Sequence, residues 1–327
     1  MTVRKTENRI PADFQAADLG EASIASDGRS ALISFVTTPL VVSRENTYVA
    51  FVTDQTLSAS AASFEWSVTE NGGTPQVQTT DQGEFSYTPA AAGTVGLVVR
   101  ILDDSKAEQA KLSLDQEVVA VNAELESLIA DAQNQPGPGV SNPEVARELI
   151  NDHNPYYQNV TLQAPESGDA FQQFLFGVVF DGALQRTAAD RKQHLADLAD
   201  SLNNGGADFA SLAGKRSGVA GVQLSLLAMN LPSMLDFTEL PEPVDQRALA
   251  AEQLRESLAA LDEEKRIDLF NLVRFPKSNI AQCARILEAL RDRYFPGTNF
   301  NDVLTGMSGV RAQFIVRQFT EGPVVRS

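Results

Sequence analysis

Hydrophobic positions follow a strand-like period in the first third of the chain. Between residues 31 and 120, runs rich in β-branched and aromatic residues, such as ALISFV, TYVAFV and TVGLVVRIL, alternate with turn-forming stretches such as ENGGTP and DQG. Strands and turns at this spacing are typical of two packed antiparallel sheets. We therefore predict an antiparallel β-sandwich over residues 31–120. Residues 1–30 show no sustained period and are predicted to form a flexible N-terminal arm.

The apolar positions of the remaining chain recur with the period of an α-helix. Residues 121–143 combine a helical stripe with the sequence PGPG, which cannot continue a helix, so a helix and a Pro/Gly linker are predicted there. Residues 144–327 are predicted to form an all-α domain, with helices that include 168–184 and 218–230. The first of these is predicted to be a core helix, because one face carries Phe171, Phe174, Leu175, Val178, Val179 and Gly182.

Two stretches of the helical part share a skeleton at an offset of 91 residues, namely GGADFASLAGKRSGV at 205–219 and PGTNFNDVLTGMSGV at 296–310. Each repeated position has an expected folding role, because the glycines suit helix ends and Ser217 and Ser308 suit the start of the next helix. The alternatives are a duplicated four-helix unit, with copies at about 168–230 and 262–320, and a chance similarity. We favour duplication.

A group of residues in the predicted sandwich resembles a known domain family. Trp66 in FEWSV, Phe85 and Tyr87 in GEFSYTP, Gly93 and the closing run to RILDD are similar to the polycystic-kidney-disease (PKD) type of immunoglobulin-like domain. In that family a Trp strand is followed by a Y-x-P…G corner and by a strand that ends in Asp. The resemblance covers residues 31–120 and implies a core built on Trp66, with Tyr87 at a strand corner. Domains of this family serve as spacers or adhesive modules.

A second, shorter resemblance lies at residues 205–217. GGADFASLAGKRS is similar to the helix-to-loop segment of parvulin-type peptidyl-prolyl isomerases, which reads G-A-D-F-x-x-L-A-x-x-x-S. This chain departs from the family pattern, since the preceding segments hold no histidine and neither G-G-D-L-G nor a terminal F-G-x-H follows. The resemblance implies a divergent isomerase or a chaperone-like surface that binds peptides.

The charge balance narrows the classes of partner. The chain of 327 residues has 43 acidic and 26 basic residues, for a net charge of −17. Such a chain repels phosphate backbones and anionic lipid head groups, so we expect neither nucleic-acid nor membrane binding. No apolar run is long enough to span a membrane, and the start has no signal-peptide core, which predicts synthesis in the cytoplasm and either leaderless export or association with a particle. Cys283 is the single cysteine and is predicted to be a buried structural thiol.

Candidate reactive groups are few. His153 follows an acidic stripe at i, i+4 spacing, so Glu148, Asp152 and His153 are candidates for general acid chemistry or cation binding, the alternative being a solvated helix face. Tyr156 and Tyr157 in NPYYQNV are candidates for partner binding or are corner plugs.

A predicted hairpin offers a candidate cation site. Asp103, Asp104 and Glu108 gather carboxylates of the kind that Ca²⁺ prefers, and a charged turn is the alternative.

The sequence contains no G-x-G-x-x-G, no Walker motif, no H-E-x-x-H and no G-x-S-x-G. We therefore predict a non-enzymatic structural or protein-interaction module without a cofactor, an accessory component of a larger assembly that works through protein partners or self-assembly. The alternatives are a divergent parvulin-like isomerase or chaperone and a carboxylate-based hydrolase around Glu148 and Asp152.

Overall fold

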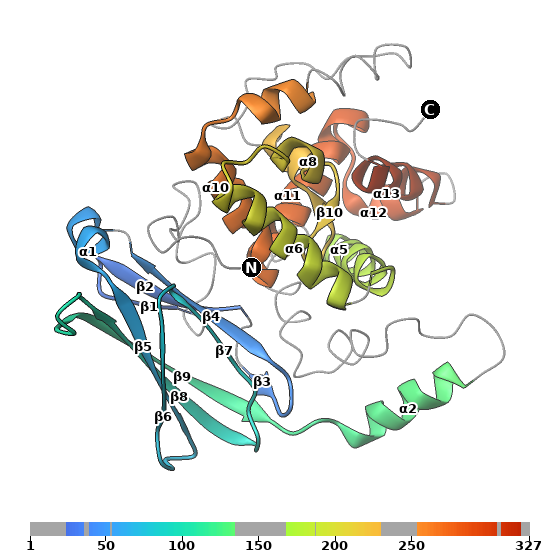
Figure 1. Ribbon diagram of the computed structural model, residues 1–327. Coiled ribbons are helices and arrows are strands. Elements are labelled where there is room, and N and C mark those ends of the chain that lie inside the picture. The colour runs from blue at the N-terminus through green and yellow to red at the C-terminus, as the bar shows by residue number, and fades with distance from the viewer. Residues whose placement is uncertain are drawn as a thin grey trace. The chain divides into compact units, whose positions relative to one another are not determined.

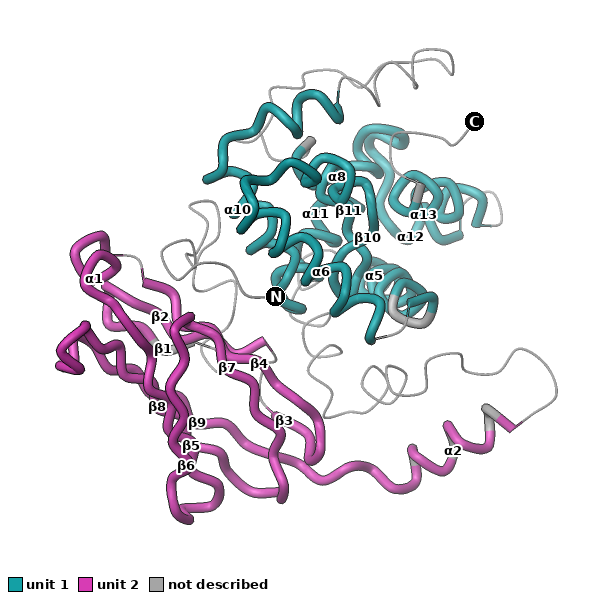
Figure 2. The backbone as a smooth tube through the Cα atoms, viewed as in Figure 1, with its two compact units in different colours: residues 1, 160–327 teal, residues 2–159 magenta. Residues whose placement is uncertain are grey.

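A computed structural model describes residues 24–35, 39–52, 54–134, 168–186, 188–229, 254–305 and 309–321. The chain divides into two compact units, residues 2–159 and residues 160–327 together with residue 1, as Figure 2 shows. Mixed sheets occupy the first unit and helices dominate the second, so the predicted order of a β-rich region followed by a helical region is confirmed. The two units are described separately below.

Two sheets make up the N-terminal unit (Figure 1). The four-stranded sheet has the order β1 (Ile24–Ser26), β2 (Ser30–Ser34), β4 (Asn46–Val52), β7 (Glu84–Tyr87), with every pair antiparallel. The five-stranded sheet has the order β3 (Leu40–Val41), β9 (Glu108–Val119), β8 (Gly93–Leu102), β5 (Ser63–Glu70), β6 (Gln76–Thr80). β1 lies inside the segment that the sequence assigned to an arm.

One strand pair corrects the expectation of purely antiparallel sheets. β3 runs parallel to β9, with Leu40 opposite Val118 and Val41 opposite Val119. The reason is that β2 and β3 follow one another along the chain but belong to different sheets. A tight hairpin would make two strands antiparallel, but β3 is not joined to β9 by a hairpin and can run parallel to it.

Side chains from both sheets form one hydrophobic cluster. Trp66 is fully buried in it, and its indole ring stacks on Phe85 with 5.4 Å between the ring centroids. Its Nε1 donates a hydrogen bond of 2.9 Å to Thr80 Oγ1, so the polar end of the ring is satisfied. The expected core position of Trp66 is confirmed. The described residues of this unit also form two helices, α1 (Gln55–Ser60), which adds Leu57 to the cluster, and α2 (Ala123–Gln133).

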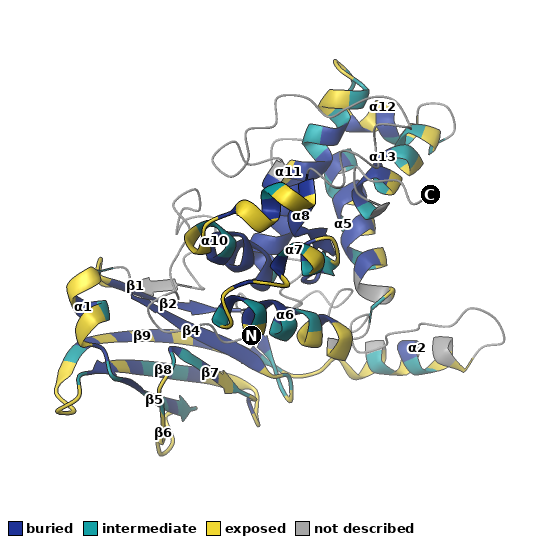
Figure 3. Cartoon of the chain, turned by 45° about the horizontal axis from the view of Figure 1, so that its top comes forward, coloured by how far each residue is buried: buried dark blue, intermediate teal, exposed yellow. Residues whose placement is uncertain are grey.

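The C-terminal unit is built around a buried helix (Figure 3). α11 (Pro276–Tyr294) is buried from Lys277 to Ala284 and contacts α5, α8, α10 and α13. The surrounding helices are α5 (Gly168–Leu184), α6 (Ala188–Asn203), α7 (Phe209–Leu212), α8 (Leu224–Met229), α10 (Glu263–Arg274), α12 (Phe300–Thr305) and α13 (Val310–Glu321), and residues 254–260 are also helical. Phe171, Leu175 and Val179 of α5 are buried, which confirms α5 as a core helix.

A β-hairpin interrupts this unit, so the prediction of an all-α domain is wrong at residues 216–223. β10 (Arg216–Ser217) pairs with β11 (Val222–Gln223), where the sequence predicted a helix. Gly218 and Gly221 hold left-handed φ values of 68° and 69°, which no α-helix accommodates. Ser217 is therefore a buried strand residue and starts no helix.

The helices follow the same order in the two predicted copies. α5, α6 and α7 are succeeded by α8 in one, and α10, α11 and α12 by α13 in the other. The hairpin has no counterpart among described residues 300–305 and 309–321. The duplication itself stays a prediction.

Candidate functional site

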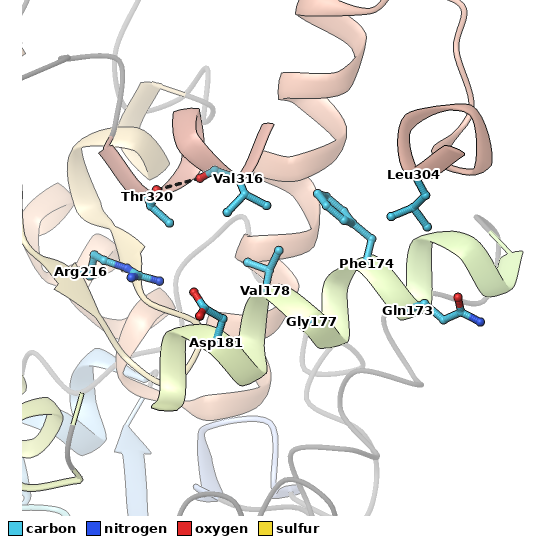
Figure 4. Close-up of a pocket in the computed structure, with 9 residues that line it drawn as sticks. All are labelled: Gln173, Phe174, Gly177, Val178, Asp181, Arg216, Leu304, Val316 and Thr320. Atoms are coloured by element: carbon cyan, nitrogen blue, oxygen red, sulfur yellow. Dashed lines mark hydrogen bonds between the residues drawn. The ribbon is translucent and has the colours of Figure 1, made fainter. Parts of the chain in front are cut away.

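A groove of about 300 Å³ opens in the helical unit between α5, α12 and α13 (Figure 4). α5 supplies one wall, because residues four apart on a helix share a face. α12 adds Leu304, and α13 adds Val316 and Thr320, whose hydroxyl donates to the Val316 carbonyl. Arg216 reaches the groove from β10. The lining is mostly apolar and consists of Gln173, Phe174, Gly177, Val178, Asp181, Arg216, Leu304, Val316 and Thr320.

The floor of the groove contains a glycine that the fold does not require. Gly177 is exposed in the middle of α5, and a Cβ added there would have no heavy atom within 4 Å. Glycine in a helix interior costs about 1 kcal/mol relative to alanine. Gly182 on the same helix differs, because its Cβ would lie 3.0 Å from Arg216 Nη2 and 3.2 Å from the Ala220 carbonyl oxygen. Packing therefore explains Gly182, whereas no packing contact explains Gly177.

A second, polar pocket of about 500 Å³ adjoins the groove, and Arg216 and Thr320 line both. Its lining carries charges of both signs and consists of Arg186, Asp190, Gln193, His194, Asp197, Gly214, Lys215, Arg216, Gln223 and Thr320. Arg216 Nη1 donates to Gln185 Oε1 at 2.8 Å, and Nε donates to the Gly221 carbonyl at 3.4 Å. Arg216 thus stands where an apolar surface meets a polar one.

The guanidinium of Arg186 supports the hairpin that carries Arg216. Its Nη1 donates to the Arg216 carbonyl at 2.7 Å and its Nη2 to the Gly218 carbonyl at 2.8 Å. Burial, together with the like charges of Arg216 and Arg191, lowers the pKa of Arg186 to about 9. Two cations therefore lie close together in a partly buried setting.

Asn279 of α11 holds the hairpin from the other side. The side chain is fully buried, and its Oδ1 accepts a hydrogen bond of 2.7 Å from the Ala220 amide. Its Nδ2 donates to the Ser217 carbonyl at 3.1 Å. The hairpin has only two paired residues on each strand, so these contacts and not its own ladder fix the position of Arg216.

The hairpin also brings a serine to a histidine. His194 Nε2 and Ser217 Oγ share a hydrogen bond of 2.9 Å, the geometry of a nucleophile and its base. Ser217, however, is fully buried and does not line the polar pocket. His194 Nδ1 is buried without a hydrogen-bond partner among the described residues, so no third group orients the ring. The hydrogen bond between them links β10 to α6, and the buried serine is no accessible nucleophile.

The buried setting of His194 predicts a pH dependence of stability. Desolvation, with Lys215 and Arg186 adding to it and Asp197 opposing it, lowers the pKa of His194 to about 4 from its ordinary 6.5. The unfolded chain therefore takes up the proton first, and stability is lost as the pH falls from about 6.5 to about 4. Because the ring is only partly buried, solvent screens this effect and we expect a loss of about 1 kcal/mol. Urea unfolding of the wild type and His194→Gln at pH 7 and pH 5 measures this difference, and equal losses in both proteins would contradict it.

Most candidate residues from the sequence fall outside the described part of the chain. These are Glu148, Asp152, His153, Tyr156 and Tyr157. The described candidates lie at the turn between β8 and β9. Among the described residues, no three His, Cys, Asp or Glu side chains are grouped as a metal site would require.

Hydrogen bonds within the turn account for Asp103. Its Oδ1 accepts from the Ser105 hydroxyl and from the amides of Ser105 and Ala107, and its Oδ2 accepts from Gln109. These hydrogen bonds, the one from the Ser105 hydroxyl above all, lower the pKa of Asp103. Glu108 faces Arg100 at 3.3 Å. The turn therefore uses these carboxylates for its own structure, and Asp104 is not drawn into a shared site with them.

Sequence reasoning missed the residues that matter most here, namely Gly177, Arg186 and Arg216. The basic pair in AGKRSG was a signal, since Arg216 lies two positions from a glycine on either side. Nothing local distinguished Gly177 from Gly182, both on α5. Cys283 is buried as expected, and burial raises the pKa of its thiol.

Comparisons with known proteins found no match for the chain. It matches no protein-family model, and no curated protein is similar to it. Within the described residues, every helix is too short or too polar to cross a lipid bilayer.

Proposed function

We propose that this protein is a non-enzymatic interaction module whose helical unit takes up an apolar side chain of a partner protein in the groove between α5, α12 and α13. Gly177 carries the proposal, since an unforced glycine lowers helix stability and its one evident effect is an open groove floor. Apolar concave sites that hold a few convergent polar groups are the usual form of binding sites.

The reactive alternatives receive less support from the same geometry. A hydrolase around Ser217 lacks an accessible nucleophile, because that side chain is fully buried. The parvulin-like stretch has its aromatic residue, Phe209, fully buried as well, so this ring packs the core and does not face a substrate. The carboxylates Glu148 and Asp152 lie outside the described residues.

The N-terminal unit fits the role of a spacer in the same proposal. We propose that its two sheets form an immunoglobulin-like sandwich of the PKD type. The orders β2-β4-β7 and β9-β8-β5-β6 support this, because they match the A-B-E and G-F-C-C′ arrangement of immunoglobulin-like sheets. Such a spacer would present the helical unit to its partner within a larger assembly.

Substitution at Gly177 tests the proposed function. Gly177→Ala is expected to raise the free energy of unfolding by about 0.5–1 kcal/mol, because it removes the cost of a helical glycine and has no neighbouring atom to strike. Gly177→Leu is expected to fold equally well and to fill the groove. Affinity capture from an extract of the organism that makes the protein should then yield a partner that Gly177→Ala retains and Gly177→Leu loses at least tenfold.

Gly214 offers a matched control in the adjoining polar pocket, since an added Cβ there also has no atom within 4 Å. Gly214→Ala should leave capture unchanged. A partner held equally by Gly177→Leu and the wild type would place the interaction elsewhere on the molecule.

A further inference from the structure

Two arginines at the junction between the groove and the polar pocket form no ion pair with a described residue. Arg186 and Arg216 have no carboxylate oxygen within 4.0 Å among the described residues. Arg186 instead donates to backbone carbonyls, and Arg216 donates to an amide oxygen and a carbonyl. Leaving a partly desolvated cation without an anion is unfavourable. In a chain with 43 acidic residues, two arginines without a contacting carboxylate among the described residues are a specific feature of this site.

The other charges around the junction would act on an added anion in both directions. The side chain of Lys215 is exposed and makes no hydrogen bond or ion pair with a described residue. Three acidic residues face the two pockets, Asp181 from α5 and Asp190 and Asp197 from α6. Asp181 Oδ2 accepts from Gln185 Nε2 at 2.7 Å, and its charge raises the pKa of Arg216 against the larger lowering effect of burial. Asp181 therefore opposes an incoming anion only in part.

We propose that the groove binds the C-terminal residue of a partner protein, with its apolar side chain between Phe174, Val178 and Val316 and its terminal carboxylate at Arg216 and Lys215. This rests on the proposed function. The carboxylate replaces the exposed amide of Gln185 on Arg216 Nη1, exchanging a neutral acceptor for a charged one. Lys215 adds a second, longer-range attraction.

A chain terminus fits this site better than an internal segment for a geometric reason. The apolar wall and Arg216 line one groove of about 300 Å³, so side chain and carboxylate must lie close together. In a C-terminal residue both leave the same Cα atom. In an extended internal segment, neighbouring side chains point to opposite faces, and an acidic neighbour of the buried residue would point away.

Two small probes separate the contributions of the apolar side chain and the carboxylate. N-acetyl-L-leucine has both, and N-acetyl-L-leucinamide lacks only the charge. Titration of each into the full-length ¹⁵N-labelled protein, followed by amide chemical shifts, is expected to show about tenfold tighter binding of the acid, with shifts at residues lining the groove. N-acetyl-leucyl-aspartamide, an internal-acid mimic, is expected to bind no better than the leucinamide.

Variants at the junction locate the carboxylate. Lys215→Gln changes an exposed side chain and is expected to weaken the acid about threefold while leaving the leucinamide unchanged. Asp181→Asn is expected to tighten the acid by a similar factor. Arg216→Met should remove the preference for the acid, and circular dichroism checks that this variant keeps its helices.

The possible outcomes distinguish recognition of a terminal carboxylate from the proposed function on which it rests, the binding of an apolar side chain in the groove. If acid and amide bound equally and Gly177→Leu abolished both, recognition of a terminal carboxylate would be overturned. The proposal that the groove binds an apolar side chain would stand. A preference for the acid that survives Lys215→Gln, Asp181→Asn and Arg216→Met would also overturn it, since the charge would bind elsewhere. Binding of neither probe would remove both proposals.

Discussion

Replacing Asn279 with alanine is expected to lower the free energy of unfolding of the helical unit by about 2–4 kcal/mol. The substitution leaves the Ala220 amide and the Ser217 carbonyl without partners, and both residues are fully buried. A buried polar group without a hydrogen bond loses its hydration and gains nothing in return. The hairpin would shift, Arg216 would leave the groove, and binding of N-acetyl-L-leucine would fall with the stability.

The two units can be followed separately in this experiment. Trp66 is the single tryptophan, so fluorescence reports unfolding of the sheet unit, whereas far-ultraviolet circular dichroism is dominated by the helical unit. Urea unfolding of Asn279→Ala should move the dichroism transition and leave the fluorescence transition in place. Arg285→Gln, on an exposed position of the same helix, is the control and should change stability by less than about 0.5 kcal/mol. A comparably small change in Asn279→Ala would mean that α11 does not anchor the hairpin.

Truncating Phe85 to alanine is expected to destabilise the sheet unit by about 3–5 kcal/mol. The Phe85 ring stacks on Trp66, Tyr48 and Tyr87, with centroid distances of 5.4, 6.5 and 6.4 Å, so its removal opens a cavity among three aromatic rings. Trp66 keeps its fluorescence as the reporter. The fluorescence transition in urea should shift to lower concentration while the dichroism transition stays.

Val77 supplies the control for that truncation. Its side chain is 62% exposed on the edge strand β6, so Val77→Ala removes apolar atoms that bury little surface. We expect a change below about 0.5 kcal/mol. If Phe85→Ala were no more harmful than Val77→Ala, the aromatic cluster would not be the core that the packing indicates.

Individual helices and strands were predicted well from the local sequence pattern where residues close in sequence determine them. β9 alternates exposed and buried residues along most of its length, as a strand with one face on the core does. The stripe on α5 is readable in the same way, because residues three and four apart share a helix face. The core position of Trp66 was readable from its place in an alternating run.

The hairpin at 216–223 could not be predicted from the local sequence pattern. Apolar residues around Gly218 and Gly221 suit a helix locally, and the prediction followed them. The actual conformation is stabilised by Asn279, 59 and 62 positions away, and by Arg186, 30 and 32 positions away. No local window includes these partners, so the hairpin and the arginine it positions were not foreseen.

By itself, the sequence determined the division into a β-rich and a helical part, the strand and helix periods, the acidic surface and the burial of Trp66 and Cys283. Each depends on composition or on side chains a few positions apart. Only the tertiary structure decided that Gly177 faces open space, that Arg186 and Arg216 form no ion pair with a described residue, and that the Ser217 hydroxyl bonded to His194 is buried. These properties depend on which segments far apart in the sequence come together. They also depend on which atoms and charges those segments place near one another.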